Sequence, residues 1–90
     1  MLLNNEALAK KKKEEGNVYS AQKNYSMAIK CYDQAISYSS GVKEYWFNKG
    51  LAHQMLEQNT EALFALNEAL KIDPCYQKAI DNKNFEKDRC

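Results

Sequence analysis

The sequence predicts an all-α fold in which pairs of helices stack as a solenoid. Alanine, leucine, lysine and glutamate are plentiful, and only three glycines and one proline interrupt the chain. This composition favours helix over strand. Apolar residues recur at steps of three and four, as on one face of a helix. The chain also matches itself at an interval of 34 residues, which is the length of a helix–turn–helix repeat.

Two glycines mark this interval, since Gly16 and Gly50 are 34 residues apart within segments that otherwise have the pattern of a helix. A glycine inside a helix costs about 1 kcal/mol relative to alanine. The same shift brings Ala28 onto Ala62, so small residues recur in both halves of each repeat. We therefore expect each glycine to lie where the two helices of its unit approach closely, Gly16 against the helix of Ala28 and Gly50 against that of Ala62.

Polar breaks divide the chain into five predicted helices. Residues 21–26 and 56–61 interrupt the pattern midway through each unit, and Asn24 and Asn59 there suit a helix C-terminus or a turn. Pro74 lacks a backbone donor and suits the start of a new element. The predicted helices cover residues 4–21, 25–38, 43–57, 59–72 and 76–88.

The residues that recur in this pattern resemble the tetratricopeptide repeat (TPR). The second unit carries the residue types of that family at its marked positions, namely Trp46, Gly50, Ala62, Leu66, Ala69 and Pro74. It departs from the pattern at His53, where tyrosine is usual. The first unit departs at Lys12 and Ser40, where tryptophan and proline are usual.

The resemblance implies a single TPR domain over residues 1–90, built as a right-handed helix–turn–helix solenoid. Unit one would cover residues 9–42 and unit two residues 43–76. Residues 77–90 would form a terminal capping helix or begin a third unit. Arrays of this kind generally need about three units for stability, so we expect that the capping helix suffices, that the chain self-associates, or that it is a fragment of a longer protein.

Composition argues against several classes of partner and site. Net charge is +1, from 13 basic and 12 acidic residues, which predicts neither nucleic-acid nor membrane binding. Cys31, Cys75 and Cys90 lack metal-ligand spacing, so we expect no metal or cofactor. Free thiols at all three positions would fit a cytoplasmic protein, with the nucleus as the alternative.

Catalysis is also not expected. The scattered glycines cannot form a phosphate-binding loop. The single histidine, His53, lies on the predicted buried side of its helix, where a packing role is expected. No pair of carboxylates is placed for acid–base chemistry. The prediction is therefore a non-catalytic protein–protein interaction module, a scaffold or adaptor.

In a stacked solenoid the first helix of each unit lines a concave face. The TPR pattern assigns that groove to Lys13, Asn17, Ser20, Phe47, Asn48, Leu51, Gln54, Met55, Lys78 and Asn82, with Phe85 as a further candidate. Ammonium and amide groups donate hydrogen bonds to carboxylate oxygens, and the remaining surface is apolar. Such a lining suits an extended peptide with a negatively charged end.

Part of this set resembles the carboxylate clamp of TPR co-chaperones, which hold the acidic C-terminal tails of the large cytosolic heat-shock chaperones. The matching residues are Lys13, Asn17, Asn48 and Lys78. Asn82 stands where the clamp has arginine, and Leu51 and Gln54 stand where it has alanine. Three alternatives stay open: a clamp, a groove for another peptide or helix, and an accessory TPR domain of a larger enzyme.

Overall fold

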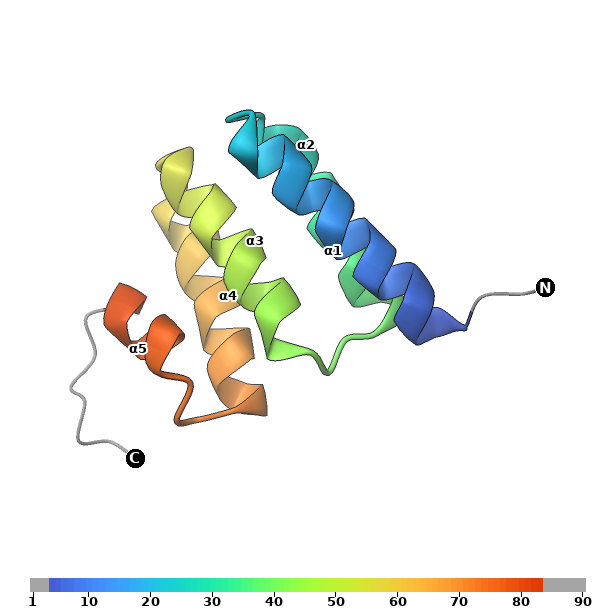
Figure 1. Cartoon of the computed structure of the whole chain (residues 1–90). Coiled ribbons are helices and arrows are strands. Elements are labelled where there is room, and N and C mark those ends of the chain that lie inside the picture. Colours follow the sequence, from blue (N-terminus) through green and yellow to red (C-terminus); the bar gives the residue numbers. More distant parts are fainter. Residues whose placement is uncertain (1–3, 84–90) are drawn as a thin grey trace.

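The computed structural model describes residues 4–83, and these form five helices with no strand among them. The helices are α1 (Asn5–Ala21), α2 (Tyr25–Tyr38), α3 (Lys43–Met55), α4 (Asn59–Ile72) and α5 (Gln77–Lys83). Each packs against the next along the chain. Figure 1 shows α1, α3 and α5 in one layer, with α2 and α4 behind them. The all-α solenoid prediction is confirmed.

The predicted boundaries agree closely with the observed helices. The ranges expected for the second and fourth helices are those of α2 and α4. Helix α3 ends at Met55, two residues before the expected end, and α5 begins at Gln77. Residues 84–88 of the last predicted helix lie outside the described residues, as do Phe85 and Cys90.

The early end of α3 has a backbone cause that also operates at the end of α1. Lys23 and Glu57 adopt left-handed conformations, with φ of 63° and 59°. The residue that follows each of them donates its backbone amide back into the helix. Asn24 donates to the Tyr19 carbonyl at 2.8 Å, and Gln58 donates to the His53 carbonyl at 2.9 Å. This six-to-one bond is the Schellman motif that closes a helix.

Asn24 lies in the turn between α1 and α2, as expected, whereas Asn59 lies at the start of α4. Asn24 caps the start of α2, and its side-chain oxygen accepts the Met27 amide at 3.4 Å. Asn59 is the first residue of α4 and follows the N-cap Gln58. An asparagine oxygen can satisfy one of the free amides at a helix start, so Asn24 closes α1 through its backbone amide and begins α2 through its side chain.

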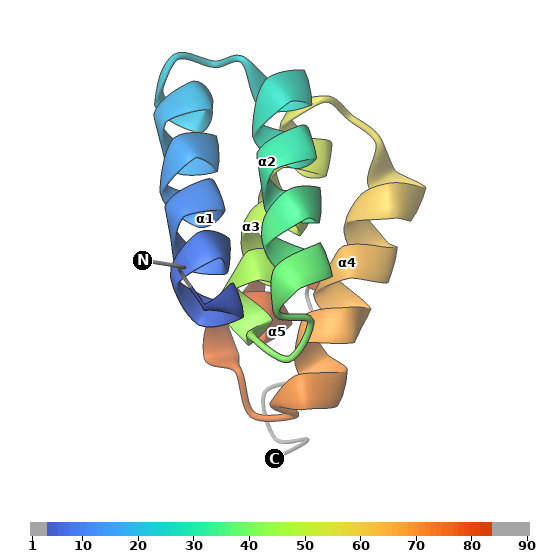
Figure 2. The same ribbon diagram turned by 90° about the vertical axis from the view of Figure 1, so that its right-hand side faces the viewer.

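Both glycines lie at close helix crossings, as predicted. A Cβ atom on Gly16 would lie 2.6 Å from Cε1 of Tyr32, in α2. A Cβ atom on Gly50 would lie 3.1 Å from Leu66 and 3.3 Å from the Ala62 carbonyl oxygen, in α4. Figure 2 shows α1 and α2 side by side as one such antiparallel pair. The absence of a side chain lets the large residue of the second helix fill the crossing.

The hydrophobic core consists of small clusters distributed along the stack. One cluster joins Ala28 and Tyr32 of unit one to Ala52 of unit two. Another contains Phe47 and Tyr76, whose rings meet edge-on with centroids 5.4 Å apart. Each cluster joins neighbouring helices, so stability arises from nearest-neighbour contacts, as in other repeat proteins.

His53 has the packing role that its position predicted. It is buried in α3, and its Nδ1 atom lies 2.7 Å from the side-chain oxygen of Gln58. This contact fixes the imidazole at the end of the helix, where the chain turns toward α4. His53 therefore contributes to the turn between the helices of unit two.

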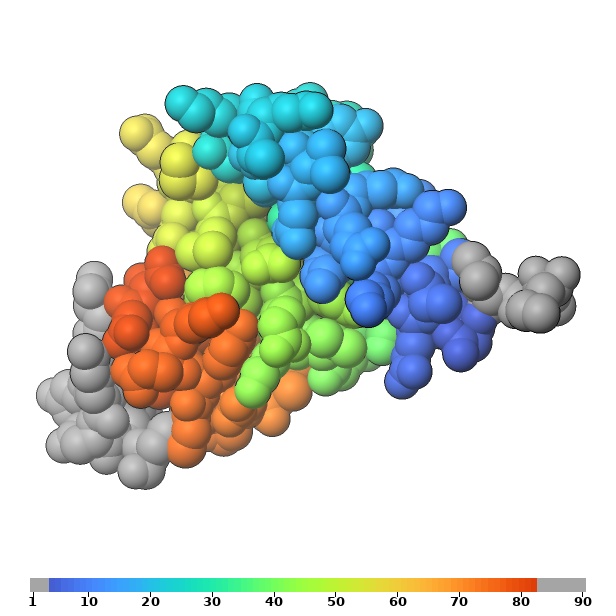
Figure 3. All heavy atoms as spheres, in the orientation of Figure 1, coloured from blue at the N-terminus to red at the C-terminus, as the bar shows by residue number. Residues whose placement is uncertain are grey.

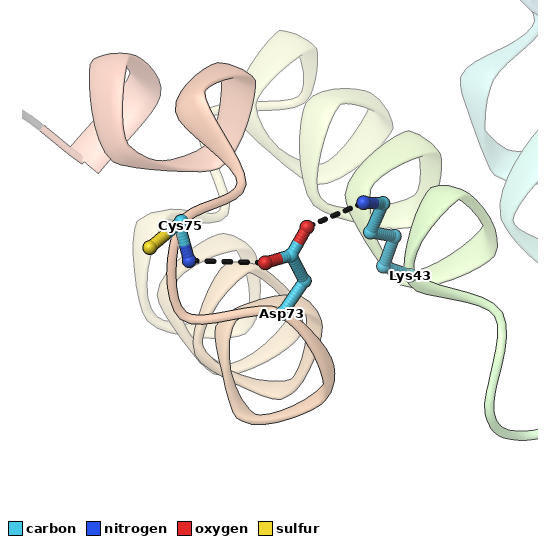
Figure 4. A network of polar contacts seen from close by, with 3 residues as sticks. All are labelled: Lys43, Asp73 and Cys75. Carbon is cyan, nitrogen blue, oxygen red and sulfur yellow. Dashed lines mark hydrogen bonds and ion pairs between the residues drawn. The ribbon is translucent and has the colours of Figure 1, made fainter. Parts of the chain in front are cut away.

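A polar corner connects α5 to the start of α3 (Figure 4). Lys43 donates to the carboxylate of Asp73 and lies 4.7 Å above the ring of Tyr76. The other carboxylate oxygen of Asp73 accepts the Cys75 amide at 3.1 Å. The corner therefore holds the turn after α4 against the beginning of α3.

The thiol prediction holds for one of the two described cysteines. Cys31 is a free thiol, and burial raises its pKa. Cys75 is disulfide-bonded, which contradicts the expectation of a free thiol at that position. Its exposed position in the turn after α4 makes its sulfur accessible to a bonding partner, unlike the buried Cys31.

Candidate functional site

A groove of about 520 Å³ opens on the layer formed by α1, α3 and α5. Figure 3 shows this layer from the front, with these helices side by side. The residues lining the groove are Asn17, Ser20, Ala21, Tyr25, Tyr32, Asn48, Leu51, Ala52, Gln54, Met55 and Asn82. None of these carries a carboxylate, so the wall presents amides, hydroxyls and apolar groups.

One end of the groove is organised by Tyr32. Its hydroxyl donates to the Asn17 side-chain oxygen at 2.6 Å and lies 3.3 Å from the Ser20 hydroxyl. Burial raises the pKa of Tyr32, with a smaller opposing effect from the Ser20 hydrogen bond, so the hydroxyl is protonated and able to donate at neutral pH. Because its oxygen is engaged, Asn17 keeps its NH₂ group as a donor for a ligand.

The other end of the groove lies where α3 meets α5. The Gln54 side-chain nitrogen approaches the Asn82 carbonyl oxygen at 3.5 Å, which connects these two helices. The Asn82 side-chain nitrogen donates to the Lys78 carbonyl oxygen at 2.9 Å. The Asn82 amide is thus partly engaged with its own helix.

Between these ends the floor is apolar. Leu51 is half-buried, Ala52 is buried, and Met55 is 60% exposed. Tyr25 adds an aromatic ring from the start of α2. A methionine with this exposure is an adaptable contact surface, since its side chain is unbranched and polarisable.

Most of the predicted groove residues line this cavity: Asn17, Ser20, Asn48, Leu51, Gln54, Met55 and Asn82. Lys13 and Lys78 lie outside it, each four residues before a lining asparagine and therefore on the same helix face. Phe47 does not line it. Phe47 is only 8% exposed and packs against Tyr76 in the core, so its assignment to the groove floor is corrected.

The groove also contains residues that the sequence pattern assigned elsewhere or did not single out. The ring of Tyr32 fills the space at the crossing of α1 and α2, and its hydroxyl reaches the groove. Ala21, Tyr25 and Ala52 line the wall as well. The sequence feature that could have pointed to Tyr32 is its hydroxyl group, because the equivalent position of unit two holds Leu66, which has no polar group.

Residues 4–83 contain no group of three or more His, Cys, Asp or Glu side chains that could hold a metal ion. No helix in the same part of the chain is long and apolar enough to cross a membrane.

The chain is similar to known proteins that contain tetratricopeptide repeats. Models of the tetratricopeptide repeat match residues 14–41 and 43–74. Small glutamine-rich tetratricopeptide repeat-containing protein 2 of Saccharomyces cerevisiae is 32% identical over 81 residues, which are 90% of this chain and 23% of that protein. The heat-shock protein cognate co-chaperone sgt12 of Aspergillus fumigatus is 38% identical over 77% of this chain and 20% of its own length. The chain thus spans about a fifth of these relatives.

Two solved structures have the same fold. The second TPR domain of Spaghetti (RPAP3), bound to the HSP90 peptide SRMEEVD, superposes with a TM-score of 0.82 and 26% identity, over 84% of this chain and 70% of that one. The Sgt2 TPR domain of Aspergillus fumigatus gives a TM-score of 0.76 and 37% identity, over 79% and 47%. These relatives are interaction modules, and the repeats here are a protein-interaction module and not a catalytic domain. The chain belongs to the tetratricopeptide repeat family.

Proposed function

We propose that the groove binds the acidic C-terminal tail of a heat-shock chaperone. The observation that carries this proposal is the row of amide side chains on a wall without carboxylates, in a fold similar to a TPR domain bound to the acidic peptide SRMEEVD. A peptide carboxylate needs several donors and no competing negative charge. Asn17, Asn48 and Gln54 supply such donors along the groove.

In this proposal Asn17 and Asn48 hold the terminal carboxylate. Tyr32 fixes the orientation of the Asn17 amide, so that its NH₂ group is already available before the peptide arrives. Preorganised donors bind more tightly because less side-chain freedom is lost on binding. Leu51 and Met55 contact the apolar side chain next to the terminus.

The lysines supply the positive charge. Lys13 precedes Asn17 by one helical turn, and Lys78 precedes Asn82 in the same way. Their flexible stems let the ammonium groups reach the groove from its rim. Two rim lysines on opposite sides would attract the acidic residues that precede the peptide's terminus.

Asn82 makes this a weak version of the clamp. An amide replaces the arginine of the clamp pattern, and its nitrogen already donates to the Lys78 carbonyl. A lost hydrogen bond to a charged group costs about 1.5–3 kcal/mol, which is roughly one to two decades in dissociation constant. The proposal therefore expects modest affinity that Asn82→Arg would improve.

The sharpest test compares SRMEEVD with its C-terminally amidated form by isothermal titration calorimetry. Amidation deletes the terminal carboxylate and leaves the rest of the peptide unchanged. The free acid should bind, and the amide should bind at least tenfold more weakly, in line with the loss of charged hydrogen bonds. Equal binding of both peptides, or binding of neither, would exclude the clamp.

Variants locate the site. Lys13→Ala and Asn48→Ala should each weaken binding, because each removes a donor to the carboxylate. Lys11→Ala is the matched control, since Lys11 is an exposed lysine of α1 that points about 200° around the helix from Lys13. Equal loss of binding in Lys11→Ala and Lys13→Ala would indicate a general charge effect and not a defined site.

If the amide binds as well as the acid, the groove takes an internal peptide or a helix on Leu51 and Met55. Met55 favours this second candidate because it is an exposed apolar residue that lines the groove. A location in the cytosol is part of the clamp proposal, because the chaperones recognised by such clamps are cytosolic. Cell fractionation tests it directly.

A further inference from the structure

A second hollow lies between α4 and α5 and shares no lining residue with the groove. Its volume is about 450 Å³. Its wall includes Phe64, Leu70, Pro74 and Ile80, together with the charged pair Glu68 and Lys71. The hollow is mainly apolar and opens beside the exposed face of α4, so it can receive an apolar side chain.

The internal repeat shows which side chain fits such a place. Ile80 follows Trp46 by 34 residues and is its equivalent in the next unit. Trp46 lies at the corresponding place, where its indole nitrogen donates to the carbonyl of Ser40, the equivalent of Pro74, at 2.9 Å, and its ring packs edge-on against Phe64 with centroids 6.2 Å apart. Isoleucine is much smaller than tryptophan, and no equivalent of Phe64 from a following helix lies among the described residues. The hollow therefore has room for an aromatic ring.

Helix α4 itself exposes such a ring. Phe64 is 57% exposed and stands at the edge of the hollow. One exposed phenylalanine is ordinary, but one adjoining an apolar hollow forms a continuous patch that marks an interaction surface. The chain thus carries both an aromatic anchor and a place for one on the same face.

The charges on this face are self-complementary. Glu68 and Lys71 pair within α4 at 2.8 Å, and the Lys71 side chain remains 73% exposed. If two copies of α4 cross antiparallel with a twofold axis beside this pair, Lys71 of each copy lies next to Glu68 of the other. The same axis brings Phe64 of one copy next to the end of α4 in the other, where Pro74 follows, because Phe64 lies about 8 Å from the axis along the helix and α4 ends at Ile72.

We infer that the α4 face is the contact surface of a symmetric homodimer, in which Phe64 of each copy enters the hollow beside Pro74 and Ile80 of the other. A twofold contact of this kind is isologous, with one patch used by both copies. It leaves the groove on the other layer open. The dimer does not depend on the proposed chaperone-tail function.

The first test measures the mass of the full chain by sedimentation equilibrium over a range of concentrations. The wild type should pass from monomer to dimer as concentration rises. Phe64→Glu should raise the dimer dissociation constant at least tenfold, as expected for a buried aromatic anchor. Val18→Glu is the matched control, because Val18 is also 57% exposed but lies on α1, and it should dimerise like the wild type.

The second test reverses charges without removing the aromatic ring. Lys71→Glu places carboxylates against each other across the axis and should weaken the dimer. Glu68→Lys combined with Lys71→Glu restores opposite charges and should recover it. Trp46 gives an independent signal, since it is the sole tryptophan and contacts Phe64, so its emission should shift with dimer formation.

A wild-type chain that stays monomeric at its highest soluble concentration would overturn the inference. So would a dimer that survives both Phe64→Glu and Lys71→Glu, because its contact must then lie elsewhere. Circular dichroism of each variant shows that the fold is kept, and the surface position of both side chains makes folding of the variants the expected result.

Discussion

Tyr32 shows how one side chain can connect packing to function in this domain. Its ring occupies the space left by Gly16, and its hydroxyl reaches through the helix pair to hold the Asn17 amide at 2.6 Å. Gly16 therefore acts on the groove indirectly: it leaves space for the Tyr32 ring, and the Tyr32 hydroxyl orients the Asn17 amide, which is a donor in the groove. At the equivalent crossing of unit two Leu66 fills the space, and no hydroxyl is available there.

The first prediction is that Gly16→Ala destabilises the fold despite its better helix propensity. The new Cβ would lie 2.6 Å from a tyrosine ring that is buried and hydrogen-bonded, so the ring has little room to move. Overpacking costs about 1–3 kcal/mol, against a gain of about 1 kcal/mol in propensity. Urea denaturation should show a net loss of up to about 2 kcal/mol.

Gly41→Ala is the control for this prediction. A Cβ on Gly41 would meet nothing within 4 Å, and no glycine in the described residues has a positive φ. Its stability should be unchanged or slightly higher. If Gly16→Ala were as harmless as Gly41→Ala, the close crossing would not contribute to stability.

The second prediction concerns Lys23 and Glu57, which hold left-handed conformations with φ of 63° and 59°. This conformation costs roughly 1–2 kcal/mol for a residue with a side chain, whereas glycine adopts it freely but loses more entropy on folding, about 0.5–1 kcal/mol. Lys23→Gly and Glu57→Gly should each stabilise the fold by about 0.5–1 kcal/mol. Lys11→Gly, in the middle of α1, should do the opposite.

At the scale of elements, helix identity was predictable from sequence because period and composition agree along each segment. The ends of α2 and α4 follow from changes in composition. The end of α3 could not be predicted, because it depends on Glu57 adopting the left-handed conformation that Lys23 adopts at the end of α1. Neither residue type signals such a conformation, so the turn chemistry became visible only in the backbone.

The candidate site was predictable to a similar degree. The amides of α1 and α3 fall in the groove because position within the repeat fixes which face they occupy. Phe47 could not be separated from Leu51 in the same way, since both are apolar and close together on α3. The docking of α5 decides between them, because Tyr76 covers Phe47 and leaves Leu51 open. That contact crosses between units and has no signature within one repeat.

The third prediction tests how α5 is held. The hydrogen bond from Lys43, and then that from the Cys75 amide, lower the pKa of Asp73. The charged carboxylate is therefore favoured in the folded state. Its contribution to stability is present above the unfolded pKa of about 3.9 and is lost as pH falls through the lower folded pKa. Stability should decline in this acidic window.

Asp73→Asn removes the titrating group and keeps an oxygen that can accept the Cys75 amide. The difference in unfolding free energy between wild type and variant should shrink as pH falls below about 4. Lys43→Gln should give a similarly flattened acid profile, since it removes the other partner. A difference that stays constant from neutral to acidic pH would mean that the ion pair does not carry the effect.

At the scale of the whole molecule, two separate surfaces lie on opposite layers of the stack. The groove lies on α1, α3 and α5, and the proposed dimer surface lies on α4. Figure 1 shows α4 behind the layer of α1, α3 and α5. Their lining residues do not overlap, although α5 contributes Asn82 to one and Ile80 to the other. A solenoid can therefore present one face to a peptide and the other to a second copy.

The fourth prediction is that the two surfaces act independently. Coupling between two binding events is reciprocal: if the peptide changes the affinity of the dimer, the dimer changes the affinity for the peptide by the same factor. Such coupling requires that each binding event favours one of two states of the structure that they share. Asn82 and Ile80 lie on the same short helix, α5. The groove amides of α1 and α3 are not among the residues that line the hollow. Phe64→Glu should therefore leave the affinity for SRMEEVD within about twofold of the wild type, well below one decade in the binding constant.

Saturating peptide should likewise leave the dimer dissociation constant unchanged in sedimentation equilibrium. A tenfold change in either measurement would show that α5 shifts when one surface is occupied, and Asn82 and Ile80 would then be the first positions to substitute in tracing that coupling.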